Sequence, residues 1–69
     1  MNSEMKIKSL HITPFGDLFR LQCYKDNSVL RAEFPTKEQA FKYAVPLAKK
    51  DNAVIVIHGN KIVEHVYKF

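Results

Sequence analysis

The chain has little of what small domains use to staple themselves together or to hold a ligand. Cys23 is the single cysteine among 69 residues, so no disulfide can form within the chain, and a lone thiol is more typical of a reducing compartment than of secretion. Glycine occurs only at Gly16 and Gly59, which excludes a glycine-rich loop that cradles phosphates. Ser, Asp and Glu form no acid–base or triad motif. We therefore expect a protein that is not an enzyme, with no cofactor and no small-molecule substrate.

Long apolar runs are also absent. No stretch of the sequence is long enough to span a bilayer, and "MNSEMKIKSL" at the N-terminus lacks the apolar region of a signal peptide. We expect a cytoplasmic protein with no membrane partner. The length allows one domain, so we assign residues 1–4 to a flexible polar tail and residues 5–69 to a single domain.

Charge of one sign is in modest excess. Eleven Lys and Arg residues against seven Asp and Glu residues give a formal net charge of +4. The basic residues are spread along the chain and form no cluster. This excess permits binding to nucleic acid or to an acidic partner but requires neither.

Three alternating segments in the first half predict a three-stranded meander. The expected strands are 5–12, 18–25 and 29–34, because apolar and polar residues alternate along them, least regularly in the first. Pro14 and Gly16 mark the first turn, within "TPFGD", and "DNS" marks the second.

A helix follows the meander. Pro35 ends the third strand, and Thr36 with Gln39 forms a capping box, so the helix is expected over "KEQAFKYAVPLAKK". Pro46 lies inside this pattern and predicts either a kink or a second short helix. Asn52 suits the left-handed C-cap position. The apolar stripe of the helix comprises Ala40, Phe41, Ala44, Val45 and Ala48, with Leu47 at its margin.

The last part, which includes "AVIVIHGNKIVEHV", predicts a hairpin that is apolar on both faces. Gly59-Asn60 is the expected two-residue turn, with His58 opposite Lys61. On that register Val54, Val56 and Val63 share one face, with Val54 opposite His65, and Ile55, Ile57 and Ile62 share the other. The predicted fold is α+β: an antiparallel sheet of four to five strands in the order β-β-β-α-β-β, with one helix on one face.

The order of motifs resembles a small bacterial and phage family known as domain of unknown function 2188. The resemblance rests on "HITP", "FPTKEQA", "LAKK" and "VIVIHGNKIVE", and covers nearly the whole chain. The chain departs from the family pattern in two places. It lacks a Trp in the second strand, where Phe19 is the nearest aromatic, and its turn after His58-Gly59 is short. The resemblance implies this fold and brings no agreed activity, cofactor or catalytic residue. The matching positions are His11, Pro14, Thr36, Lys37, Glu38, Ala40, Leu47, Ala48, His58, Gly59, Lys61 and Ile62.

The two apolar faces of the last hairpin suggest a partner. One helix covers the valine set or the isoleucine set, and soluble monomers rarely expose the other. We therefore expect a protein-interaction module that binds either a second copy of itself or a host protein; the alternative is that the first hairpin of the same chain bends over the valines. The expected interface residues are Val54, Val56, Val63, His65, Tyr67 and Phe69, because aromatic residues are enriched at interfaces.

Nucleic-acid binding is the alternative function. Arg and an aromatic residue on an open sheet face can hold phosphates and stack bases. The candidate residues are Lys6, Lys8, Arg20, Tyr24 and Arg31. No RNP-type motif is present, and Glu33 and Glu64 dilute the patch.

The remaining reactive side chains are interpreted structurally. His11, His58 and His65 lack the helical spacing of a metal site, so we expect them at the surface or rim of the sheet and predict no metal. Cys23 shares a face with Leu21 and is expected in the core, with no sequence signature of a nucleophile.

Overall fold

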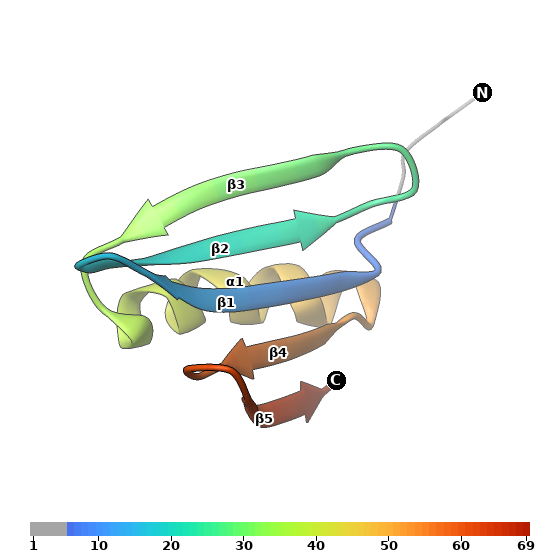
Figure 1. Ribbon diagram of the computed structural model, residues 1–69. Coiled ribbons are helices and arrows are strands. Elements are labelled where there is room, and N and C mark those ends of the chain that lie inside the picture. The colour runs from blue at the N-terminus through green and yellow to red at the C-terminus, as the bar shows by residue number, and fades with distance from the viewer. Residues whose placement is uncertain (1–5) are drawn as a thin grey trace.

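A computed structural model, which describes residues 6–69, has one helix lying across one face of a five-stranded sheet (Figure 1). The strand order is β3-β2-β1-β4-β5. The predicted α+β class, the order of elements and the single helix are confirmed, whereas the predicted tail, residues 1–4, lies outside the described residues. The elements are β1 (Ser9–Phe15), β2 (Leu18–Tyr24), β3 (Val29–Phe34), α1 (Lys37–Asp51), β4 (Val54–His58) and β5 (Val63–Lys68).

The sheet is mixed, so the prediction of a purely antiparallel sheet is wrong. β1–β2, β2–β3 and β4–β5 are antiparallel, but β4 pairs with β1 in parallel. The helix is the cause, because α1 carries the chain from the edge strand β3 back across the sheet. The chain then enters β4 in the same direction as β3, which is also the direction of β1. A crossover helix is the usual connection between parallel strands.

The first turn is tighter than the sequence suggested. Pro14 and Phe15 belong to β1, and Gly16-Asp17 alone connects β1 to β2. Pro14 pairs with Phe19 on β2, but β4 pairs with β1 only as far as Ile12. Pro14 therefore lies where β1 has one neighbour, a position at which a missing N–H is tolerated. Gly16 has a φ of 60°, which is the conformation that glycine adopts most readily.

The helix has the predicted caps and is continuous. The Gln39 N–H donates to Thr36 Oγ1 at 3.1 Å, and Asn52 adopts the left-handed conformation at the C-cap. Pro46 lies inside α1 without dividing it, so a second short helix is excluded. The C-terminal end of α1 also holds the start of the sheet, since Asp51 Oδ2 accepts from the Ile7 N–H at 2.9 Å.

The core lies between α1 and the sheet. Three alanines on α1 are fully buried, and these small side chains let the helix approach the strands closely. The isoleucine side of β4 meets the helix, so it is the valine side that α1 leaves uncovered. The buried core residues are Ile7, Leu10, Ile12, Leu21, Cys23, Ala40, Ala44, Ala48, Ala53, Ile55 and Ile57.

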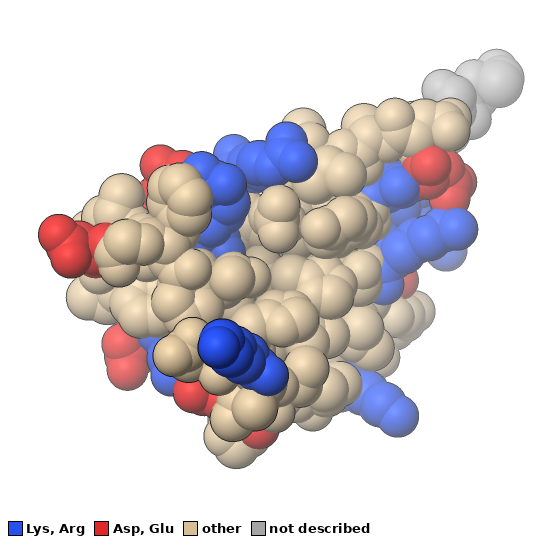
Figure 2. Space-filling model, viewed as in Figure 1, with Lys and Arg blue, Asp and Glu red and all other residues tan. Residues whose placement is uncertain are grey.

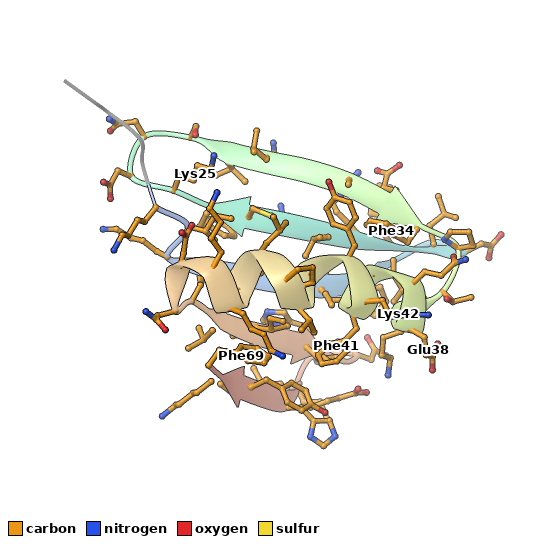
Figure 3. All side chains as sticks on the ribbon, turned by 180° about the vertical axis from the view of Figure 1, so that it is seen from behind. Lys25, Phe34, Glu38, Phe41, Lys42 and Phe69 are labelled. Atoms are coloured by element: carbon orange, nitrogen blue, oxygen red, sulfur yellow. The ribbon has the colours of Figure 1, made fainter. Side chains whose placement is uncertain are left out.

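One helix is too narrow to cover five strands. An α-helix is about 10 Å wide, whereas five strands at a spacing of about 4.8 Å span roughly 20 Å. A groove of about 300 Å³ therefore remains beside β5, lined by residues that include Phe41, Ile57 and Tyr67. A second groove, of about 380 Å³, lies between the helix and β3. Figure 3 shows Phe41 on the β5 side of α1, where its ring lies 5.0 Å from that of Tyr67.

The last hairpin differs most from the prediction. Gly59–Ile62 separates the strands, and the Gly59 N–H donates to the Ile62 carbonyl at 2.7 Å. The positive φ, 67°, falls on Lys61 and not on Gly59. The predicted two-residue turn and its register are therefore wrong. Glycine is favoured at position 59 for a steric reason, because a Cβ there would come within 2.6 Å of the Glu64 carboxylate.

A β-bulge changes which side chains share a face. Ile57 pairs with His65 and His58 pairs with Val63, so Glu64 is an extra residue on β5. Ladder partners lie on the same side of a sheet. Val63 therefore keeps the side of His58, and Val66 takes the same side by pairing with Val56. Ile62, expected beside the helix, lies in the turn and is 62% exposed.

Candidate functional site

The sheet face opposite α1, here called the open face, is the candidate site. None of the described residues forms a layer over it, and it is the side that faces the viewer in Figure 1. The alternative in which the first hairpin bends over the valines is excluded, because β1 and β2 belong to the same sheet as β4. Figure 2 shows that most of the middle of this face carries neither Lys, Arg, Asp nor Glu, whereas blue side chains lie over β2 and β3 and another projects near the turn between β4 and β5.

The half of the open face on β4 and β5 is apolar. Four valines make up this patch, here called the valine strip: Val54, Val56, Val63 and Val66. The two on β4 are half-buried by their neighbours, and the two on β5 are 53% and 51% exposed. β5 is also an edge strand, so the strip ends at a row of backbone groups that no described strand pairs.

The half of the open face on β2 and β3 is polar and partly neutralised. The Arg20 guanidinium binds the Glu33 carboxylate at 2.8 Å and lies 3.7 Å from the centre of the Phe15 ring. Arg31 lies opposite Gln22 on the same face. Arg20, one of the side chains predicted to bind phosphate, is therefore already held by the Glu33 carboxylate and the Phe15 ring.

A pair of histidines connects the two halves. The register places His11 on β1 opposite Gln22 on β2 and Val56 on β4, and His58 follows two residues after Val56. His11 Nδ1 lies 2.8 Å from His58 Nε2, while His11 Nε2 lies 3.2 Å from Ser9 Oγ.

The two imidazoles meet edge to edge, with their rings close to one common plane. Their centroids are 5.0 Å apart and their planes differ by 22°. That separation is close to the N···N distance plus the radii of the two rings, so the facing nitrogens lie on the line between the rings. In a neutral pair one of these nitrogens carries a proton and donates it, and the other accepts. Tyr24 meets His11 with a T-shaped contact, at a centroid distance of 5.1 Å.

The environment of His11 favours its neutral form. Burial, and secondly the charge that His58 would carry, lower the pKa of His11 below its ordinary value. Burial removes water from the charged imidazolium, and a like charge on His58 would repel it. Sequence reasoning missed this pair. The signal was present in the alternation of "SLHI" and "VIVIH", which places both histidines on the valine side once β4 is set beside β1.

The predicted interface residues divide between the two faces. Val54, Val56 and Val63 do share the open face. His65 and Tyr67 do not, since they pair with the helix-side residues Ile57 and Ile55, and the bulge at Glu64 is the physical reason. Phe69 follows β5 and lies on the helix side in Figure 3. Val66, which the expected register did not include, belongs to the valine strip.

The predicted nucleic-acid residues come together only in part. Arg20, Tyr24 and Arg31 share the open face. Lys6 and Lys8 precede β1, and the Lys8 amine binds Asp26 at 2.9 Å. The hydrogen bond and the charge of Asp26 raise the pKa of Lys8. The basic patch therefore has fewer uncompensated cations than the sequence suggested.

Cys23 is buried in the core, as predicted, and burial raises the pKa of its thiol, with Lys25 acting in the opposite direction. Over residues 6–69, no three His, Cys, Asp or Glu side chains are grouped as metal ligands would be. Within the same range, no helix has the length and apolar character needed to cross a membrane.

Comparisons with known proteins add no relative. The chain matches no protein-family model, no curated protein and no solved structure. The resemblance to domain of unknown function 2188 therefore stays a prediction from the motifs, and function has to be argued from the open face itself.

Proposed function

We propose that this chain is a non-enzymatic protein-interaction module that forms a two-fold homodimer through its open face. The observation that carries the proposal is the valine strip. β4 is buried on its isoleucine side, whereas on the opposite side of the sheet Val63 and Val66 of β5 are half exposed. Soluble monomers rarely leave a contiguous apolar patch in water.

A second copy fits this surface because the valine strip is complementary to itself. An isologous interface uses the same patch on both partners, and the strip contains no charged side chain that would repel its own copy. Two such sheets pack face to face about 10 Å apart, as in a β-sandwich. The cations Arg31 and Lys68 lie on either side of the strip, where a polar rim is expected.

The available area sets the strength of the association. Five strands of about six residues cover roughly 20 by 20 Å. Stable interfaces bury about 800 Å² on each partner. The flat area of the whole open face, about 400 Å², is smaller than this. The association should therefore be weak, and the dimer should dissociate on dilution.

The size of the core also favours a partner. The chain is short, has no disulfide, and its helix contributes only alanines to the fully buried core. Small domains bury a low fraction of their surface and often need a partner chain for stability. Packing a second sheet on the open face would add an apolar layer on the side that lacks one.

The test is the mass in solution by light scattering across a dilution series, for the wild type and two variants. Val66→Lys places a charge in the valine strip. Leu30→Lys is the matched control, because Leu30 is 53% exposed on an edge strand but pairs with Cys23 on the helix side. We expect a dimer for the wild type and Leu30→Lys and a monomer for Val66→Lys, with all three folded by circular dichroism. A wild type that stays monomeric at high concentration would refute the homodimer and leave a host protein as the occupant.

Nucleic-acid binding is the second candidate, favoured by the exposed Arg31 and Tyr24 on one face. Phosphate binding weakens steeply as salt rises, because counterions are released. Apolar self-association holds or strengthens in sulfate. Titration of a single-stranded oligonucleotide at two salt concentrations, with Arg31→Ala as the variant, distinguishes the two functions.

We also propose that the protein works in the cytoplasm and belongs with the small bacterial and phage proteins that its motifs resemble. The buried free thiol of Cys23 supports the first statement, because such a thiol persists in a reducing compartment.

A further inference from the structure

The histidine pair is continuous with the valine strip. His11 lies opposite Val56, which lies opposite Val66, so the three form one row across β1, β4 and β5. His58 lies opposite Val63 at the end of the strip. Any sheet that packs on the valines will therefore also cover, or approach closely, the two imidazoles.

The pair has room for one proton between its facing nitrogens. At an N···N distance of 2.8 Å, one N–H fills the line between the rings. A further proton can be bound on an outer nitrogen while this bond remains. Protonation of all four ring nitrogens would set two N–H groups head to head and two positive charges side by side. The pair must then separate.

The rest of the open face does little to stabilise an imidazolium. Among the strand residues on this face, the only side-chain carboxylate is that of Glu33, which already binds Arg20. β1 and β4 contribute no charged group other than the two histidines, and α1 lies on the other side of the sheet. The titratable and charged side chains that the other strands place on this face are Arg20 and Tyr24 on β2, Arg31 and Glu33 on β3, and Lys68 on β5. Lys61 lies in the turn that follows His58.

We propose that the His11–His58 pair makes self-association of this chain depend on pH, with the dimer favoured when the pair is neutral and dissociated when the pair takes up a proton. This inference rests on the proposed homodimer. The physical reason is that face-to-face packing removes the water that solvates an imidazolium, with no free carboxylate to replace it. Association and loss of the proton are therefore linked.

The number of protons released on association sets how steeply the dissociation constant of the dimer depends on pH. If each protomer releases one proton on association, the dimer releases two. The dissociation constant then rises by up to about 100-fold for each pH unit below the range in which the pair titrates. For His11 itself, burial and the charge that His58 would carry lower the pKa below its ordinary value.

The experiment measures the dimer dissociation constant by analytical ultracentrifugation between about pH 8 and about pH 5. Three proteins are compared: the wild type, the double variant His11→Gln with His58→Gln, and His65→Gln. His65 is the matched control, because it is the third histidine of the chain and pairs with Ile57 on the helix side. Circular dichroism at each pH verifies that every sample is folded.

We expect weaker association at acidic pH for the wild type and for His65→Gln, and a nearly constant dissociation constant for the double variant. A dimer whose affinity does not change with pH, or whose pH dependence survives in the double variant, would overturn this inference and leave the homodimer intact. A monomer at every pH would overturn both. Nitrogen-15 NMR of the imidazoles gives an independent readout, since the ring nitrogens should report uptake of the further proton over the same pH range in which the dimer dissociates.

Discussion

The two sides of β4 offer the sharpest test of the fold, because adjacent residues on one strand should respond differently to the same kind of truncation. Ile55 points toward α1 and is fully buried, whereas Val56 points to the open face and is half-buried. Ile55→Ala removes three carbons at about 0.8 kcal/mol each, plus a cavity term, which gives a loss of about 3–4 kcal/mol. Val56→Ala removes two carbons that are half in water already, which gives about 1 kcal/mol and no enclosed cavity.

These losses are large against the total. A domain of this length has about 3–10 kcal/mol of unfolding free energy, so Ile55→Ala should leave a protein that is close to unfolding at room temperature. The measurement is urea denaturation followed by circular dichroism, at a concentration low enough to keep the chain monomeric. Equal slopes against urea would show that the denatured states are comparable. If Val56→Ala in dilute solution were as destabilising as Ile55→Ala, the valine side would be buried within the monomer and the argument for an open face would be wrong.

Further predictions concern single positions. Thr36→Ala removes the acceptor for the Gln39 N–H and should cost about 1 kcal/mol in urea denaturation; an unchanged midpoint would contradict the capping role. Lys61→Gly relieves a positive φ in the last turn and should stabilise the protein by about 0.5–1 kcal/mol, measured as a higher melting temperature. The thiol of Cys23 is buried with a raised pKa, so it should react slowly with a thiol reagent in buffer and fast in urea; fast reaction in buffer would refute its burial. Because the pKa of His11 is lowered on folding, the unfolded chain binds more protons, and stability should be full above the ordinary histidine pKa and fall as the pH drops through the lower folded value. The His11→Gln variant should lose less unfolding free energy over the same pH range, as measured by urea denaturation.

Local signals in the sequence predicted most of the elements. Alternation located β2 and β3, the capping box located the start of α1, and Asn52 located its end. Each of these features depends on interactions between residues close in the chain, which propensity and periodicity describe well. The assignment of Cys23 and Leu21 to the core followed from the same alternation.

The last hairpin shows where local reasoning fails. Gly59-Asn60 matched a common two-residue turn, but the chain uses Gly59–Ile62 and a bulge at Glu64. A shift of register moves side chains from one face to the other. Tyr67 and His65 therefore left the predicted interface, and Val66 entered it.

The chain order and the alternation of side chains are properties of the sequence, and they predicted the single helix, a sheet of four to five strands and the apolar character of both sides of β4. These local patterns do not determine which strands pair, because the pairing depends on where the helix returns the chain to the sheet. Only the tertiary structure placed β4 parallel to β1, and this long-range pairing brought His11 within hydrogen-bonding distance of His58, 47 residues away in the sequence. The same arrangement placed Ile55 and Ile57 against the helix and left the valines of β4 and β5 on the open face, since one helix covers one side of a sheet.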